Sequence, residues 1–516
     1  MEINGEIFVI LGAIILMIAL LVADFMRPGL VLFSVVVLFM CLGILSPTEA
    51  VAGFSNEGML TVALLFLVSE GVRRSDALGF LIKKLLPEKK GATVRDGYAR
   101  LLPTIMSISA FLNNTPIVVV FIPIIKQWAK KAGLPLKKFL IPLSYAAILG
   151  GICTLIGTST NLVVHGMMLD AGYRGFTMFE LGQVGLVIAV VGGLYIYFLG
   201  ERRLPDDQPL PAEEMAEEDE EHIVEAVIGP RFPGINRTYH DFNFKSHYGA
   251  DIREVWRRGI RQTNVKRLTF KEGDMLVLET DGNFITTWGD SSVFLALNNG
   301  KEHKIACPRW KRWLALGLLT VMIAGATFGS YPAVQNLIPG IQLDMFFWVC
   351  IVTVVMACIN LFPAKKYTKF ISWDVLITIA CAFAISRAMS NSGLADFAAS
   401  KLIALSGDVS PIALLAILYV ITNVITELIT NNAAAAFAFP IALATATQLG
   451  VDPMPFFVTI CIAASASFSS PIGYQTNLIV QGIGNYRFKD FVRIGLPLNL
   501  IMFVITIILV PVFWKF

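Results

Sequence analysis

The feature that most restricts how this chain folds is a short polar segment that occurs twice. Residues 157–166 read GTSTNLVVHG and residues 473–482 read GYQTNLIVQG, so six of ten positions are identical. The two copies lie 316 residues apart. Repetition over such a distance predicts two copies of one structural unit.

A pair of neighbouring asparagines precedes each copy of this segment. Asn113 and Asn114 lie in the first half, and Asn431 and Asn432 lie in the second half at nearly the same offset. The two polar motifs therefore recur as a set, and they form the polar centre of a chain that is otherwise apolar.

The apolar segments follow the same offset. Segment 29–46 falls on 345–362, and segment 179–200 falls on 495–516. Hydrophobic residues make up 55% of the sequence, charged residues make up 15%, and the mean hydropathy is +0.68. Many apolar runs reach the roughly 20 residues that are needed to cross the hydrocarbon of a bilayer. The sequence therefore predicts an all-α, multi-pass membrane protein built from two repeats of about 200 residues.

Composition and spacing argue against several other classes of protein. The formal net charge of +3 is too small to indicate nucleic-acid binding. The seven cysteines show no CxxC or Cys/His spacing, so we expect neither a disulfide framework nor a metal site. We find no nucleophile–base pattern and no phosphate-binding loop, and we do not expect an enzyme.

The basic residues predict how the first half is oriented, because Lys and Arg gather on the cytoplasmic side of membrane proteins. Segment 73–100 carries eight of them and segment 126–138 carries five. Both are expected in the cytoplasm, so the apolar segment 101–125 must enter and leave on the same side. Three prolines and the first asparagine pair interrupt that segment. This pattern predicts a re-entrant helical hairpin with Asn113 and Asn114 at its tip.

The second half is predicted to have the opposite orientation. Segment 410–448 holds Asn431 and Asn432 near its middle, but few basic residues flank it, so this hairpin is expected to open to the outside. The loop 331–344 contains no Lys or Arg and is also expected outside. An inverted repeat with a broken hairpin in each copy is typical of secondary transporters, in which the site lies where the tips meet.

A polar insert separates the two repeats. It begins at Glu201 with an acidic run, and it contains short strand-like runs at 222–228 and 274–279 and a predicted helix near 251–258. We expect a small α+β domain on the cytoplasmic side. The predicted domains are residues 1–200 for the first membrane repeat, 201–308 for the cytoplasmic domain with its acidic linker, and 309–516 for the second, inverted membrane repeat.

Four uncharged clusters are expected to converge in this arrangement. They are Asn113 to Thr115, Thr158 to Asn161, Asn431 with Asn432, and Gln475 to Asn477. Asn amides and Thr hydroxyls donate hydrogen bonds without charge, and broken helix ends add backbone N–H donors that suit an oxyanion. Exposed carbonyl oxygens suit a hard cation such as sodium. Neither asparagine pair has a Lys, Arg or His within its cluster, so co-bound sodium is expected to offset the charge of a multivalent anion.

A second interpretation of these residues is purely structural, because membrane Asn and Thr also hold helices together through bonds of roughly 0.6–2 kcal/mol. The repetition of both motifs favours a binding site. Two acidic residues are given other roles: Glu70 is expected to form a surface ion pair with Arg73 and Arg74, and Glu427 is expected to support the second hairpin.

Residues 464–480, ASASFSSPIGYQTNLIV, resemble the signature of the divalent anion:sodium symporter (DASS) family, including its Ser, Phe, Pro, small residue, Asn and terminal Val. The resemblance extends over both membrane halves. It implies a homodimeric elevator transporter in which each protomer has a scaffold and a moving transport domain.

The resemblance also implies roles for residues at the two hairpin tips, which usually read Ser-Asn-Thr in that family and bind the substrate and sodium. The implied substrate-binding residues are Asn113, Asn114, Thr115, Thr160, Asn431, Asn432, Ala433 and Thr476. The implied sodium site one contains Asn113, Asn114, Gly157, Thr158 and Asn161. The implied sodium site two contains Asn431, Asn432, Gly473, Thr476 and Asn477.

The insert resembles a TrkA-C domain, the C-terminal domain of RCK proteins. The resemblance rests on segments 233–237 (PGINR), 248–252 (YGADI) and 273–278 (GDMLVL). Family members with such an insert look like the sulfate-transporting branch. A larger amide at each tip is also compatible with a compact tetrahedral oxyanion.

The leading interpretation is sodium-coupled import of sulfate, or of a related inorganic or organic dianion, across the plasma (inner) membrane. The transporter would be a homodimer embedded in lipid, with the insert in the cytoplasm. The alternatives are a sodium-coupled succinate or malate transporter, an anion exchanger and, from a different class, a membrane sensor or gated channel controlled by the insert. The two intact Thr-Asn loops favour sodium coupling over exchange, and closed hairpins disfavour an open pore.

Overall fold

A computed structural model describes most of the chain. It covers residues 5–516 except 24–25, 78–91, 207–222, 230, 258–259, 263–264, 266–267, 281–283, 289–290, 292, 299–307, 330, 332–333, 335–340 and 407–409. The predicted acidic run and four of the basic residues that predicted the orientation, at 83–90, lie outside the described residues.

The described part of the chain contains eight helical segments that are long and apolar enough to cross a membrane. They are α1 (Gly5–Val22), the continuous segment of α3 (Pro47–Ala52), η1 (Gly53–Ser55) and α4 (Glu57–Arg74), α10 (Gly182–Arg203), α15 (Arg309–Gly329), α18 (Trp373–Asn391), α20 (Pro411–Leu428), α21 (Asn431–Leu449) and α24 (Phe488–Phe513). Three shorter apolar helices are α2 (Pro28–Cys41), α17 (Met345–Cys358) and α22 (Met454–Ser465). The prediction of an all-α, multi-pass membrane protein is confirmed.

Each half contains the same series of elements. In the first half the hairpin α6 (Val94–Ser109) and α7 (Asn114–Ala132) is followed by α8 (Lys137–Gly151), α9 (Ser159–Asp170) and α10. In the second half the hairpin α20–α21 is followed by α22, α23 (Gln475–Gly484) and α24. An unwound loop separates α8 from α9, and its counterpart separates α22 from α23. The polar segment found twice in the sequence begins in these loops and continues into α9 and α23.

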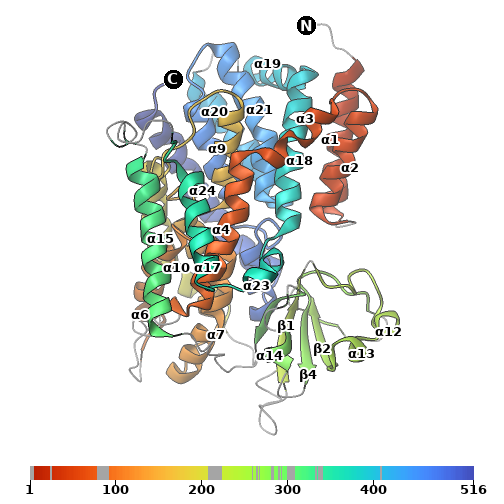
Figure 1. Ribbon diagram of the computed structural model, residues 1–516, viewed down its shortest axis with the longest axis vertical. Coiled ribbons are helices and arrows are strands. Elements are labelled where there is room, and N and C mark those ends of the chain that lie inside the picture. Colours follow the sequence, from red (N-terminus) through yellow and green to blue (C-terminus); the bar gives the residue numbers. More distant parts are fainter. Residues whose placement is uncertain are drawn as a thin grey trace.

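The two hairpins enter the molecule from opposite ends. Figure 1 shows α6 and α7 at the lower end and α20 and α21 at the upper end of the long axis. The first hairpin breaks between Ser109 and Asn114, and Pro116 falls in the first turn of α7, where a missing N–H removes no intrahelical hydrogen bond. The second hairpin breaks between Leu428 and Asn431. The predicted inverted arrangement is therefore present in the fold.

The insert forms a five-stranded antiparallel sheet in the order β3-β2-β4-β1-β5. Its strands are β1 (Ile223–Ile228), β2 (Asp251–Arg257), β3 (Ile260–Arg261), β4 (Met275–Glu279) and β5 (Phe294–Asn298), and its short helices are α12 (Tyr239–Phe242), α13 (Phe244–Tyr248) and α14 (Phe284–Trp288). The strands expected at 222–228 and 274–279 are confirmed. The helix expected near 251–258 is wrong: this segment is β2, because Ile252 and Val255 pair with Leu278 and Leu276 of β4.

Side chains alternate between the two faces of a strand, and on β1 and β4 both faces are buried. On β1, Val224, Ala226 and Ile228 belong to the insert's own aromatic-rich core. Ile223 and Val227 belong to the core of the helical part instead. The insert is thus packed against the helices through one face of its sheet, below α23 in Figure 1.

Candidate functional site

The first hairpin tip is fastened by Asn114, the first residue of α7, which is 1% exposed. Its amide nitrogen donates to Ser109 Oγ at 2.7 Å and to the Ala147 carbonyl at 3.1 Å, and its amide oxygen accepts from Tyr474 OH at 2.7 Å. The neighbouring Thr115 donates to Gln475 Oε1 at 3.2 Å. Tyr474 and Gln475 belong to the repeated segment of the other half, so the first tip is bound to the second repeat.

The second hairpin tip is bound to the first repeat in the corresponding way. Asn432 is 5% exposed, and its amide oxygen accepts from Ser159 Oγ at 3.0 Å and from Thr160 Oγ1 at 3.3 Å. Asn431 Nδ2 donates to Thr160 Oγ1 at 2.7 Å. All four predicted clusters therefore meet, and each tip contacts the repeated segment of the opposite half.

Four helices begin at this meeting point. They are α7 at Asn114, α9 at Ser159, α21 at Asn431 and α23 at Gln475. Their N-cap residues are Asn113, Thr158, Thr430 and Tyr474, and none of the four makes a side-chain capping hydrogen bond. Each helix N-terminus carries a partial charge of roughly +0.5 and unpaired N–H donors. The convergence of four such ends makes the site electropositive.

The two unwound loops are held by equivalent asparagines. Asn161 Nδ2 donates to the Thr154 carbonyl at 2.8 Å, and Asn477 Nδ2 donates to the carbonyls of Ser467 at 2.9 Å and Ser470 at 3.2 Å. Asn477 Oδ1 and Thr476 Oγ1 both contact Ser144 Oγ, at 2.6 and 2.8 Å. These bonds hold the carbonyl groups of Thr154, Ser467 and Ser470 towards the asparagine of the same loop.

Gly157 and Gly473 allow these loops to pack closely. A Cβ atom at Gly157 would lie 2.4 Å from the Gly151 carbonyl oxygen, and one at Gly473 would lie 2.3 Å from the Thr426 carbonyl oxygen. Both distances are too short for a carbon atom. The Gly473 contact joins the second loop directly to the second hairpin.

The predicted site residues differ in how accessible they are. Asn113, Thr115, Ser159 and Asn431 are partly exposed, and Gln475 is exposed. Among the described residues, Asn113 makes no side-chain hydrogen bond. Thr160, Thr476 and Ala433 are at most 1% exposed, and both hydroxyls bond within the protein. A bound ion would therefore contact the exposed and partly exposed residues before it reached the buried ones.

Two acidic residues act as supports. Glu427 accepts from the backbone N–H groups of Phe468 and Ser469, at 3.0 and 2.9 Å, and from Asn499 Nδ2 at 2.7 Å, as expected for a residue that stabilises the second half of the site. Glu70 pairs with Arg73 and Arg74 at 2.7 and 2.5 Å, although the group is nearly buried and does not lie on the surface.

Sequence analysis did not single out Tyr474, Gln475, Ser159 or Ser144 as individual members of the site. The signal that would have found the first two is the mismatch between the copies, since Thr158 and Ser159 of the first copy become Tyr474 and Gln475 in the second.

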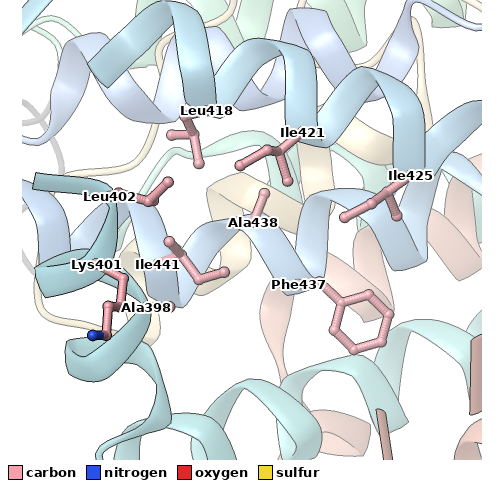
Figure 2. Close-up of a pocket in the computed structure, with 9 residues that line it drawn as sticks. All are labelled: Ala398, Lys401, Leu402, Leu418, Ile421, Ile425, Phe437, Ala438 and Ile441. Carbon is pink, nitrogen blue, oxygen red and sulfur yellow. The ribbon is translucent and has the colours of Figure 1, made fainter. Parts of the chain in front are cut away.

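A separate cavity of about 260 Å³ lies between α19 (Leu394–Ser406), α20 and α21. Figure 2 shows its walls, which are Ala398, Lys401, Leu402, Leu418, Ile421, Ile425, Phe437, Ala438 and Ile441. Apart from Lys401 these side chains are apolar, so the cavity does not offer the hydrogen bonds that a small anion needs.

The sequence matches the family described as citrate transporter over residues 13–348 and 337–515. An uncharacterized transporter of Synechocystis is 29% identical over 97% of this chain and 96% of that protein. A probable sodium/sulfate cotransporter of Chlamydomonas reinhardtii is 23% identical over 90% of this chain and 83% of that protein. A sodium-dependent dicarboxylate transporter of Staphylococcus aureus is 31% identical, but over 28% of each chain.

Among solved structures, the YdaH transporter of Alcanivorax borkumensis resembles this chain with a TM-score of 0.52 and 14% identity. The alignment covers 90% of this chain and 87% of that one. The likeness concerns the fold alone.

Proposed function

Because the chain belongs to the citrate transporter family, we propose that it is a sodium-coupled symporter that imports a divalent oxyanion, with sulfate as the favoured substrate. The observation that carries this proposal is the convergence of the N-termini of α7, α9, α21 and α23 on one cluster of amides and hydroxyls. Helix N-termini are ready-made sites for anions. The family is one of transporters, so no enzymatic step is needed.

The chemistry of the cluster supports a small, strongly charged anion. Asn113, Thr115, Ser159, Asn431 and Gln475 offer neutral groups that remain partly exposed or exposed. No charged side chain hydrogen-bonds to the tip asparagines among the described residues. A dianion bound there would need a co-bound cation to offset its charge, which favours symport over anion transport alone.

The unwound loops support sodium as that cation, because carbonyl and amide oxygens are the ligands that hard cations prefer. Sodium site one would be built from Asn113, Asn114, Gly157, Thr158 and Asn161, and sodium site two from Asn431, Asn432, Gly473, Thr476 and Asn477. Each net positive charge that enters gains roughly 2.3 kcal/mol per 100 mV of membrane potential. An excess of sodium would therefore drive accumulation of the anion.

The choice of sulfate rests on two points. The tips carry Asn113 and Asn431 where the DASS family usually has serine, and the larger amides are compatible with a compact tetrahedral oxyanion. The similarity to a probable sodium/sulfate cotransporter spans 90% of the chain, whereas that to the dicarboxylate transporter spans 28%. Sodium-coupled succinate or malate transport is the second candidate, and exchange of anions without sodium is the third. A sensor or gated channel controlled by the insert is the candidate from another class.

The remaining features of the proposal concern the whole transporter. It would be a homodimer in the plasma (inner) membrane, working by an elevator movement of the hairpins and the loop helices. The domain division at 1–200, 201–308 and 309–516 belongs to this proposal, as does the assignment of the insert as a cytoplasmic TrkA-C-like domain. The packing of β1 against α23, where Val227 lies on Gly482, supports a role for the insert in transport, because α23 would move with the second hairpin in this proposal.

The experiment is uptake of labelled sulfate into proteoliposomes with and without an inward sodium gradient, with succinate and malate as competitors. We expect uptake that depends on sodium and is not inhibited by either dicarboxylate. Sodium-dependent uptake of succinate would reassign the substrate. Uptake that does not depend on the sodium gradient would favour the exchanger. Large unitary currents in a bilayer recording would favour the channel.

A further inference from the structure

The two copies of the repeated segment differ at position 474, which lies at the centre of the site. The first copy has Thr158 there, and the second has Tyr474, a side chain long enough to cross from one half to the other. Tyr474 is 7% exposed, and its hydroxyl lies 2.7 Å from the Asn114 amide and 2.9 Å from Thr158 Oγ1. Both partners belong to the proposed sodium site one.

The hydrogen bonds of this group fix the direction of each polar atom. The Asn114 nitrogen is used by Ser109 Oγ and the Ala147 carbonyl, so its oxygen accepts the single phenolic hydrogen of Tyr474. The oxygen of Tyr474 is then free to accept from Thr158. The phenol therefore orients both an amide oxygen and a hydroxyl that sodium site one would use.

The backbone that carries Tyr474 is part of the proposed sodium site two. It follows Gly473, where a Cβ atom would lie 2.2 Å from Ser467 Oγ and 2.3 Å from the Thr426 carbonyl oxygen. The loop is therefore packed directly against the second hairpin at Gly473. The backbone of Tyr474 therefore lies at the proposed sodium site two, and its hydroxyl reaches the proposed sodium site one.

We propose that Tyr474 is a positioning residue that couples the two sodium sites, an inference that rests on the proposed function. Sodium at site two orders the loop around Gly473 and so places the hydroxyl that orients Asn114 and Thr158. Coupling free energies are reciprocal, so sodium at site one favours site two to the same extent. The result is cooperative binding of two sodium ions.

The test is Tyr474→Phe, which removes one oxygen atom and keeps the ring. Sodium dependence is measured twice: as sodium-induced thermal stabilisation of the purified protein and as sodium-dependent sulfate uptake. We expect the Hill coefficient to fall from above 1 towards 1 and the half-saturating sodium concentration to rise about tenfold, within the range of typical coupling between sites.

The control is Tyr486→Phe, which removes another buried phenol that donates to the Lys137 carbonyl outside the site. It should leave the sodium dependence unchanged. Thr158→Val removes the other partner with little change of shape, and its effect should not add to that of Tyr474→Phe. If Tyr474→Phe does not fold, the Hill coefficient of Thr158→Val decides the matter, because loss of a sodium ligand alone would raise the half-saturating concentration without removing cooperativity.

An unchanged Hill coefficient and half-saturating concentration in Tyr474→Phe would overturn the inference, as would a lower maximal rate alone. The proposed function fails separately. If sodium stabilises the wild type but the wild type takes up no sulfate, the proposed substrate is wrong. The sodium titration of Tyr474→Phe still tests the coupling in that case. If wild type responds to sodium in neither assay, both proposals are overturned.

Discussion

At the scale of single residues, the two members of each asparagine pair have different surroundings. The second member, Asn114 or Asn432, is buried and bonded to the opposite repeat. The first member, Asn113 or Asn431, is partly exposed. We interpret the second as the residue that fixes the tip and the first as the residue that meets the transported anion. Sequence alone does not separate them, because both are asparagine.

Replacing Asn113 and Asn114 separately tests this difference. Asn113→Ala should raise the KM for sulfate about tenfold, as expected for the loss of about 1.4 kcal/mol of binding, and leave thermal stability unchanged. Asn114→Ala should abolish uptake and destabilise the protein by about 1–3 kcal/mol, because its buried partners lose their hydrogen bonds. Uptake kinetics and thermal unfolding of the purified variants give both values. The opposite assignment of effects would contradict the interpretation.

Gly473→Ala tests the close packing of the second loop. The added methyl group meets the Thr426 carbonyl at 2.3 Å, so the loop must move and uptake should fall at least tenfold. Gly317→Ala on α15 is the matched control, since a Cβ atom there meets nothing within 4 Å. Uptake by the control should match wild type. Equal activity of the two variants would show that the loop tolerates displacement.

At the scale of elements, hydropathy, prolines and the repeat were sufficient to predict both hairpins and the meeting of their tips. Three aspects were not accessible. The strand at 251–257 was mistaken for a helix, because its pairing with β4 is a tertiary contact. The pairing of each tip with the opposite repeat depends on how the halves fold together. The contacts of the Tyr474 hydroxyl with Asn114 and Thr158 also depend on how the halves pack, although the mismatch between the two copies marks the position.

The contact between α7 and β1 includes an ion pair that is nearly buried. Lys126 Nζ lies 3.0 Å from Glu225 Oε2, and the side chains are 10% and 2% exposed. Glu225→Gln leaves the ammonium group without its carboxylate partner and should destabilise the protein by about 3 kcal/mol. Thermal unfolding of a double-mutant cycle that combines Glu225→Gln with Lys126→Met should give a favourable coupling energy between the two side chains.

The control for this cycle is the exposed pair of Lys245 and Asp251, whose side chains are 68% and 47% exposed. Asp251→Asn should lower the stability much less than Glu225→Gln does, because water screens such an exposed pair. Similar losses of stability in Glu225→Gln and Asp251→Asn would mean that the ion pair between Lys126 and Glu225 does not hold the insert on α7.

At the scale of the whole molecule, the insert contacts parts that lie far apart in the sequence. Leu478 of α23 packs on Gly273, and Val227 packs on Gly482. On another side, Arg231 donates to the Ile371 carbonyl at 2.7 Å, just before α18. The insert therefore joins the helices that begin in the site to a different part of the membrane domain.

The inverted arrangement predicts opposite accessibility for the bases of the two hairpins. Lys131→Cys on α7 and Thr447→Cys on α21 place a thiol at exposed positions, on a background in which the native cysteines are replaced. A membrane-impermeant thiol reagent should label Thr447→Cys in intact cells and Lys131→Cys only in inside-out vesicles. Labelling of both from one side would contradict the inversion.

In the proposed mechanism, sodium and a dianion bind together where the four helix N-termini meet, and equilibrium binding measures this directly. Labelled sulfate is titrated onto the detergent-purified protein in sodium, with choline replacing sodium in the comparison, for wild type and for Asn432→Ala. We expect saturable binding to wild type that requires sodium and is lost in the variant. Binding of equal affinity in choline, or full binding by Asn432→Ala, would contradict the account.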